Sequence, residues 1–226
     1  PPFFFQAHHA PPDSVASRGL GDVYKRRFSK RYIDQSIEIC QSIDIETIET
    51  IAQALADLRK RKGRLFFIGS GGRAGHSSHA VNDFRKIANI EAYTPTDNVS
   101  ELTARINDDG WESSYLNWLK VSRFSKKDAL FVFSVGGGNR EKNISINLVR
   151  CVEYANELGA VTMGIVGKDG GYSKQSSDLV LVIPTQDEAL ITPHTESFQA
   201  VVWHLLVSHP LLLQNQMKWE SETEKI

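Results

Sequence analysis

Short apolar runs that are followed directly by glycine-rich turns constrain the fold of this chain most strongly. Residues 65–68 (Leu-Phe-Phe-Ile) and 129–133 (Ala-Leu-Phe-Val-Phe) are apolar at every position. Runs without alternation are typical of strands buried on both faces, which occur in parallel sheets covered by helices. Further runs lie at 90–93, 161–166 and 179–183. The sequence therefore predicts an α/β fold with a parallel sheet of about five strands.

Segments with helical spacing of apolar residues connect these strands. The predicted helices span 74–87, 98–108, 111–121, 144–158 and 195–206. Two more helices precede the first strand, one from Phe28 to Cys40 and one that follows Asp44 as its N-cap and ends before Gly63. We interpret residues 1–27 as an irregular N-terminal arm and residues 28–226 as one domain.

The composition excludes several classes of protein. A net charge of −1 gives no electrostatic footprint for nucleic acid or membrane. No apolar run reaches the roughly 20 residues of a membrane span, and the first residues lack the pattern of a signal peptide. The two cysteines, Cys40 and Cys151, lie in helical patterns, and we do not expect a disulfide. These features favour a reducing compartment, the cytoplasm.

Two glycine-rich turns follow the strands. The first turn is Gly69-Ser70-Gly71-Gly72-Arg73, and the second turn is Ser134-Val135-Gly136-Gly137-Gly138-Asn139. Each precedes a predicted helix, and glycines let the free N–H groups of a helix start approach an anion closely. Right-handed crossovers bring such turns to one edge of a parallel sheet. We expect both turns to bind a small phosphorylated or similarly polar ligand; tight turns without a ligand are the alternative.

Side chains suited to metal binding or proton transfer follow the first turn and recur near the end of the chain. His79 and Asp83 are spaced i, i+4, which places them on one face of a helix; His76 lies three residues earlier. Glu196 and His204 are separated by about 12 Å along a straight helix, so both bind one ion only if the helix start is irregular or a second subunit contributes. A surface histidine beside a carboxylate and a core histidine are the alternatives.

The order and spacing of these features between Phe28 and His209 resemble the sugar isomerase (SIS) family, and within it the phosphoheptose isomerase branch. The resemblance rests on the two leading helices, both glycine-rich turns, Asp97 after the second strand, the turn at 167–171 and the last helix. It implies a three-layer sandwich with a five-stranded parallel sheet, in homodimers or homotetramers with shared active sites.

The resemblance also implies roles for individual residues. His79, Asp83, Glu196 and His204 correspond to a zinc site, and one of the two carboxylates with His204 corresponds to an acid/base pair. The residues that would position the sugar phosphate are Ser70, Gly71, Gly72, Arg73, Asp97, Ser134, Gly136, Gly137, Gly138 and Asn139. The chain departs from the branch where Asp83 replaces a glutamate, where Glu196 replaces a glutamine, and in the second turn, which has few hydroxyl groups.

These features together predict a ketose–aldose isomerase that acts on a sugar phosphate, with sedoheptulose 7-phosphate as the first candidate. Proton transfer through an enediol needs a base, together with an acid or a metal such as Zn²⁺ that stabilises the oxyanion. The alternative is a non-catalytic SIS protein that senses a sugar phosphate. The clustering of acid/base and metal-binding residues favours the enzyme.

Overall fold

Residues 15–217 are described by the structure, a computed structural model, with side chains from residue 25 onward. The chain divides into two compact units, residues 1–41 and 42–226. The first unit consists, as far as it is described, of helix α1 (Val15–Ser42), which exposes Phe28 and Ile33. Helix α1 extends into residues 15–27, where the sequence predicted an irregular arm; residues 1–14 lie outside the described part.

The second unit contains a five-stranded sheet with the order β2-β1-β3-β4-β5, and every pair of neighbours is parallel. The strands are β1 (Leu65–Ile68), β2 (Ala92–Tyr93), β3 (Ala129–Phe133), β4 (Val161–Val166) and β5 (Leu179–Val182). Leu65 of β1 lies opposite Ala92 of β2 and Ala129 of β3, so β1 lies between these two strands. The predicted α/β fold with five parallel strands is confirmed.

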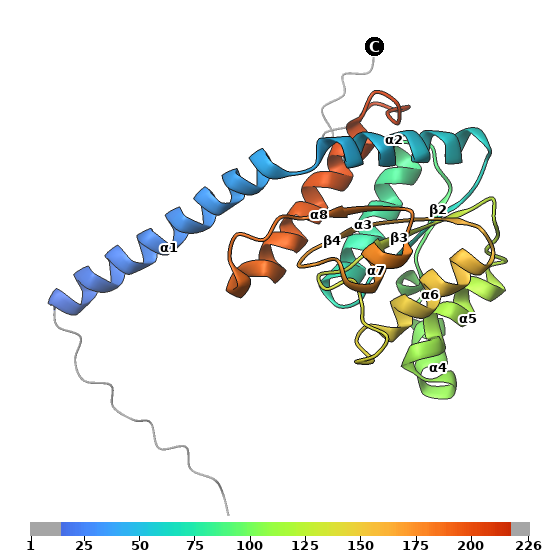
Figure 1. The fold of residues 1–226 in the computed structure, drawn as a ribbon, viewed down its shortest axis with the longest axis horizontal. Helices are drawn as coiled ribbons and strands as arrows, with labels where there is room; N and C mark the ends of the chain where they lie inside the picture. Colours follow the sequence, from blue (N-terminus) through green and yellow to red (C-terminus); the bar gives the residue numbers. More distant parts are fainter. Residues whose placement is uncertain (1–14, 218–226) are drawn as a thin grey trace, which may run out of the picture. The chain divides into compact units, whose positions relative to one another are not determined.

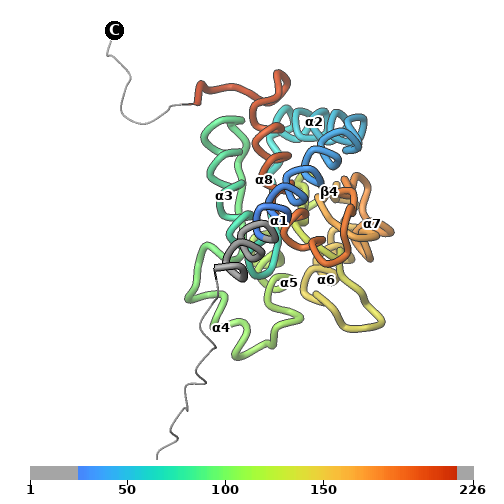
Figure 2. Tube along the Cα trace, turned by 90° about the vertical axis from the view of Figure 1, so that its left-hand side faces the viewer, coloured from blue at the N-terminus to red at the C-terminus, as the bar shows by residue number. Residues whose placement is uncertain are grey.

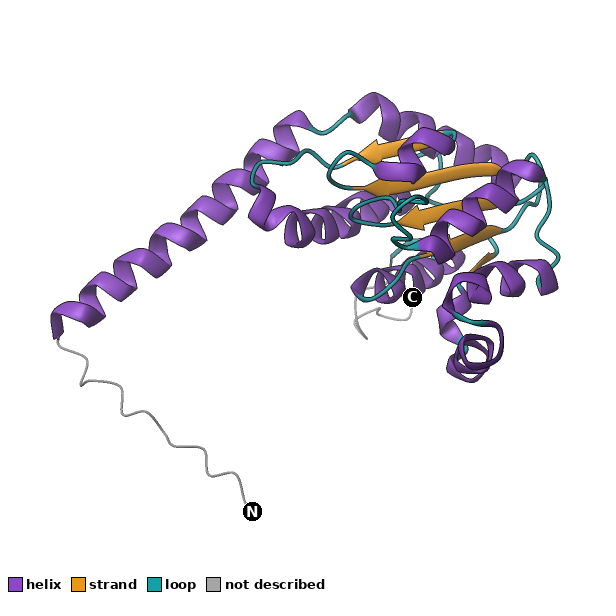
Figure 3. Ribbon diagram, turned by 60° about the horizontal axis from the view of Figure 1, so that its bottom comes forward, coloured by secondary structure: helices purple, strands orange, loops and turns teal. Residues whose placement is uncertain are grey.

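Helices cover both faces of this sheet, which gives three layers (Figures 1 and 3). One face carries α2 (Ile45–Lys60), α3 (Gly72–Lys86) and α8 (Ile191–Ser208). The other carries α5 (Trp111–Val121), α6 (Ile146–Glu157) and α7 (Gly171–Ser176), and α4 (Val99–Asp109) packs on α5. Short 3₁₀ helices, η1 (Pro95–Asp97) and η2 (Glu188–Leu190), precede α4 and α8. Figure 2 shows α3 beside α8, the pair that carries the candidate site.

The fully apolar strands place large side chains on both faces of the sheet. Phe66 and Leu130 belong to a buried cluster with residues of α5 and α6. Phe67 packs against Phe84 of α3 with ring centroids 5.3 Å apart, on the opposite face. The side chains therefore alternate between two cores, and α3 is fixed on β1 directly beyond the first turn.

Beyond the start of α1, three differences from the predicted elements concern the sheet and the helices around it. Strand β2 has only two residues, α8 begins at Ile191 rather than near 195, and α7 was not predicted. Helix α7 is short and polar, so it has no apolar periodicity. It is held instead by backbone bonds of 2.9 Å from the N–H groups of Tyr172 and Ser173 to the carbonyls of Gly138 and Gly137 in the second turn.

Both cysteines are free thiols. Cys40 is exposed on α1, whereas Cys151 is fully buried on α6, and burial raises the pKa of its thiol far above the usual range. Across residues 15–217, no helix combines the length and the apolar character that crossing a bilayer requires.

Candidate active site

The strand order places the two glycine-rich turns beside each other. From β1 the chain continues to β2 on one side of the sheet, and from β3 it continues to β4 and β5 on the other side. The turns after β1 and β3 therefore flank the point where the strand order reverses. Ligands of open α/β sheets bind in the crevice at such a point. The side chain of Asn147, in the first turn of α6, donates a 3.2 Å hydrogen bond to Oγ of Ser70 and so links α6 to the first turn.

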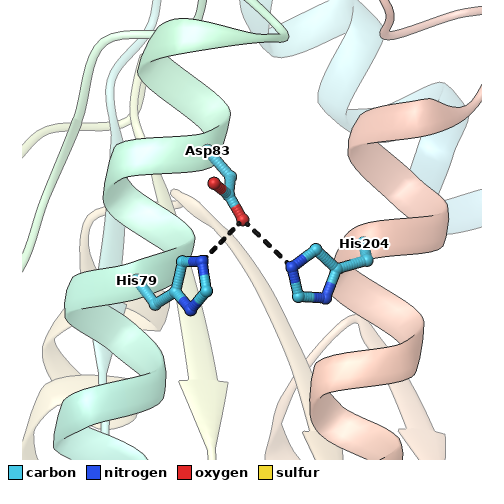
Figure 4. A group of neighbouring side chains, drawn as sticks. All are labelled: His79, Asp83 and His204. Atoms are coloured by element: carbon cyan, nitrogen blue, oxygen red, sulfur yellow. Dashed lines mark ion pairs between the residues drawn. The ribbon is translucent and has the colours of Figure 1, made fainter. Parts of the chain in front are cut away.

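Three candidate metal-binding side chains converge between α3 and α8 (Figure 4). Nε2 of His79 and Nε2 of His204 each lie 3.5 Å from the same oxygen, Oδ2 of Asp83. One ligand atom from each residue lies within 4.8 Å of the others. The i, i+4 pair predicted on α3 therefore meets the histidine predicted on the last helix.

A hydrogen bond selects the tautomer of His204 in its neutral form. Nδ1 of His204 lies 2.8 Å from the carbonyl of Ala200, and because a carbonyl only accepts, Nδ1 carries the hydrogen. In the neutral ring, Nε2 therefore turns a lone pair toward Asp83. The Asp83 side chain is 9% exposed, whereas those of His79 and His204 are 55% and 51% exposed, so the site is open on one side. Two imidazoles and a carboxylate match the three protein ligands of catalytic zinc sites.

Glu196 lies apart from this cluster and pairs with Arg73. Nη1 of Arg73 donates to Oε1 of Glu196 over 2.6 Å, and both side chains are about one quarter exposed. The other oxygen, Oε2, lies over the first turn, since a Cβ added to Gly72 would meet it at 3.2 Å. The structure thus places the predicted anion-binding arginine on a carboxylate, and it does not bring Glu196 into the three-residue cluster.

The second turn is shaped by close backbone packing. Gly137 has φ +67°, and a Cβ there would lie 1.8 Å from the carbonyl oxygen of Gly170, so glycine is required. Oγ of Ser134 accepts the N–H of Gly137 over 3.0 Å, and Oδ1 of Asn139 accepts the N–H of Lys142 over 2.8 Å. Part of the glycine content therefore has a packing reason, independent of any ligand.

A cavity of about 560 Å³ lies beside the second turn. Its walls include Gly136 and Gly138 of the turn. The charged residues that line it are Arg140, Lys142 and Lys168 together with Glu141 and Asp169, so it carries charge of both signs. None of the three cluster residues lines this cavity. Asp97, the remaining predicted residue, accepts a hydrogen bond from Ser78 on the exposed side of α3.

Two buried residues of α8 contact the site and were not predicted from the sequence. Gln199 is fully buried and lies 3.1 Å from the ring of His76, and Trp203 donates a hydrogen bond to Asp83. They are spaced i, i+4, so they share the face of α8 that also faces the sheet. Gln199 could have been found from the sequence, because it is a polar residue on an otherwise apolar face of the helix. Trp203 could not, because a tryptophan on such a face is typical of an ordinary core residue.

Comparisons with known proteins agree with this architecture. LmbN, a lincomycin biosynthesis protein of Streptomyces lincolnensis, is 32% identical over 169 residues, which are 70% of this chain but only 60% of that protein. A phosphoheptose isomerase of Helicobacter pylori (strain P12) is 25% identical over 194 residues, 83% of this chain and 93% of that protein. The structure of phosphoheptose isomerase GmhA from Neisseria gonorrhoeae matches with a TM-score of 0.70 and 20% identity, over 81% of this chain and 96% of that one.

The sheet order agrees with the fold of phosphoheptose isomerase GmhA, and the histidine–aspartate cluster is compatible with a metal site. No protein-family model matches the chain. The chain is similar to curated phosphoheptose isomerases over 83% and 80% of its length.

Proposed function

We propose that this chain is a ketose–aldose isomerase that acts on a sugar phosphate. The observation that carries the proposal is the cluster of His79, Asp83 and His204, which is open to solvent and lies on α3 and α8, the helices that meet the sheet beside the two glycine-rich turns. Two imidazoles and a carboxylate that are open to solvent are suited to hold a cation that polarises a small hydroxylated ligand.

Sedoheptulose 7-phosphate is the substrate that we propose first, because relatives with 25–27% identity over most of their length are named phosphoheptose isomerases. The two lysines in the cavity beside the second turn support a phosphorylated substrate, although Glu141 and Asp169 also line it. Lys142 and Lys168 would attract a phosphate there, and the backbone of Gly136 and Gly138 would approach it without a side chain in between.

We assign His79, Asp83 and His204 as the residues that would hold a divalent cation, with Zn²⁺ the best match to two imidazoles and one carboxylate. When bound, such a cation polarises a carbonyl and stabilises negative charge that develops on its oxygen. His204 would offer Nε2, because its Nδ1 hydrogen is held by Ala200. The lone pair on that nitrogen cannot bind a cation and accept a proton at the same time.

The transfer of the carbon-bound proton therefore falls to a carboxylate, and we assign it to Glu196. Oδ2 of Asp83 already accepts a hydrogen bond from Trp203 and faces both histidines. Oε2 of Glu196, in contrast, lies over Gly72 of the first turn. Glu196 would remove a proton from one carbon of the substrate and return it to the neighbouring carbon, through an enediol.

The half-exposed histidines also support an assembly of two or four copies in which a second copy covers the site. The exposed side chains of Val201 and Leu205 beside His204 are compatible with such a contact. Light scattering of the purified protein tests this part of the proposal, and a monomer at micromolar concentration would refute it.

The activity is tested on purified protein by metal analysis and by turnover of sedoheptulose 7-phosphate with and without a chelator. About one equivalent of metal per chain and chelator-sensitive isomerisation are expected. Metal without turnover on this sugar would refute the heptose substrate and direct the search to other sugar phosphates. Binding of the sugar phosphate with neither metal nor turnover would refute the enzyme and favour a sensor.

A further inference from the structure

Trp203 forms the floor of the three-residue cluster. It is 2% exposed, and its ring lies 5.4 Å from that of His79 and 4.9 Å from that of His204. On the other side it packs against Phe133 of β3, with centroids 5.8 Å apart. Contacts with two helices and the sheet leave a large, rigid ring little freedom to move.

The indole N–H of Trp203 points at the carboxylate of the cluster. Nε1 donates a 3.1 Å hydrogen bond to Oδ2 of Asp83, and both side chains are buried. Oδ2 is also the oxygen that lies 3.5 Å from both histidine nitrogens. The second oxygen, Oδ1, accepts a 3.0 Å bond from the side chain of Asn82. Both carboxylate oxygens of Asp83 thus accept a hydrogen bond. The donor to Oδ2, the oxygen that faces the histidines, is a ring with little freedom to move.

The chemistry of an indole makes this contact selective. Its N–H donates and never accepts, so the oxygen that faces it must be an acceptor. The terminal torsion of an aspartate is otherwise broad, and a freely turning carboxylate would present Oδ2 to the histidines only part of the time. Partners outside the immediate ligands commonly orient them in this way, and their loss weakens metal binding about 10- to 100-fold.

We propose that Trp203 is a positioning residue, whose N–H holds Oδ2 of Asp83 between His79 and His204 in the orientation that a divalent cation requires. The inference rests on the cation site of the proposed function. It assigns to a buried aromatic side chain of α8 a role in metal affinity that goes beyond its role in the core.

The test compares the affinity of the metal-free protein for Zn²⁺, measured against a competing chelating dye, and the visible spectrum of bound Co²⁺. Trp203→Phe keeps an aromatic ring and removes the N–H. We expect Zn²⁺ to bind 10- to 100-fold more weakly and the Co²⁺ bands to lose intensity. Trp118→Phe, in a ring that packs on Phe66 away from the cluster, is the matched control and leaves both readouts unchanged.

Two further variants separate the hydrogen bond from packing. Replacement of Trp203 by β-(3-benzothienyl)alanine keeps the shape of the bicyclic ring and lacks only the N–H, so it should weaken Zn²⁺ as Trp203→Phe does. In an Asp83→Ala background, Trp203→Phe should cause no additional loss, because its target is gone. Full affinity in the benzothienyl protein, or an equal loss in the Asp83→Ala background, would overturn the proposal.

The outcomes also separate this inference from the proposed function. If the wild-type protein binds no Zn²⁺ but isomerises the sugar phosphate in the presence of chelator, the positioning role is refuted and the isomerase stands. If the metal affinities behave as expected and no sugar phosphate is turned over, the positioning role stands and the isomerase is refuted.

Discussion

Nδ1 of His76 lies 3.1 Å from Oε1 of the fully buried Gln199. Nε2 of the same amide donates to the carbonyls of Ser134 and Ile165, over 3.2 and 3.0 Å. Because both amide hydrogens are used by acceptors, Oε1 faces the imidazole, and Nδ1 of His76 carries the hydrogen. One side chain of α8 thus joins α3 to the ends of β3 and β4, directly beneath the second turn.

Gln199→Leu should destabilise the protein strongly. Leucine fills a similar volume, but the Nδ1 hydrogen of His76 and the carbonyl of Ser134 would lose their partners, at about 1–3 kcal/mol for each buried polar group. We expect the free energy of unfolding to fall by roughly 2–4 kcal/mol in urea denaturation. Gln53→Leu, on the exposed face of α2, is the control and should change it by less than about 0.5 kcal/mol. An unchanged midpoint for Gln199→Leu would show that the network contributes little.

His204→Ala should abolish isomerisation while the fold is retained. The side chain is half exposed, so its loss leaves no large cavity, but it removes one of three candidate ligands. Turnover should fall by at least about 10²-fold, and Zn²⁺ should bind more weakly. His209→Ala is the control, since His209 pairs with Glu49 outside the cluster. Normal turnover in His204→Ala would remove His204 from the mechanism.

Glu196→Gln tests whether Glu196 acts as the base or as a metal ligand. As the base, Glu196 is needed for exchange of the substrate's carbon-bound proton with solvent, so deuterium uptake from D₂O should fall about 10²- to 10⁴-fold. Zn²⁺ affinity should not change, because Glu196 lies outside the cluster. The exposed Glu188→Gln is the control. Loss of Zn²⁺ with retained exchange would make Glu196 a ligand and not the base.

Acid should weaken the fold partly through Asp128. Burial of this carboxylate opposes its ionisation, but hydrogen bonds from Arg64 and from the N–H of Ser125 outweigh the burial, so the pKa of Asp128 lies below its usual range. As the pH falls, Asp128 therefore becomes protonated in the unfolded chain before it does so in the folded protein. The stabilisation is complete above the unfolded pKa of about 4 and is lost as the pH falls through the lower pKa of the folded state.

Asp128→Asn should reduce the dependence of stability on pH in the acid range, because the variant has no carboxyl group at this position. In the variant, an amide N–H would face the donors of Arg64 and Ser125, so we expect about 1–3 kcal/mol less stability at pH 7. Below about pH 4 the difference from the wild type should shrink. Urea denaturation at pH 7, 4 and 3 measures both effects. A constant difference across this range would mean that the carboxyl does not titrate below its usual range.

The sequence was sufficient for the fold and for the pairing of His79 with Asp83, because uninterrupted apolar strands and i, i+4 spacing are local patterns. It was insufficient where distant segments meet. The contact of Arg73 with Glu196 joins residues on two different helices, and Trp203 has the same apolar pattern whether or not its N–H meets a carboxylate. The start of α1 was missed for a different reason, since residues 15–27 have no apolar stripe to mark a helix.

Gly137→Ala tests whether the second turn tolerates any side chain. Gly137 has φ +67°, and its Cβ would lie 1.8 Å from the carbonyl oxygen of Gly170, a backbone atom that cannot move aside cheaply. We expect a loss of about 1–3 kcal/mol in the free energy of unfolding and a higher KM for the sugar phosphate, since the adjacent Gly136 and Gly138 line the cavity beside the second turn. Gly75→Ala is the matched control: it lies within α3, an added Cβ meets nothing within 4 Å, and alanine should stabilise the helix by up to about 1 kcal/mol. Equal stability of the two variants would show that the second turn shifts without cost, and the packing reason for its glycine would then be wrong.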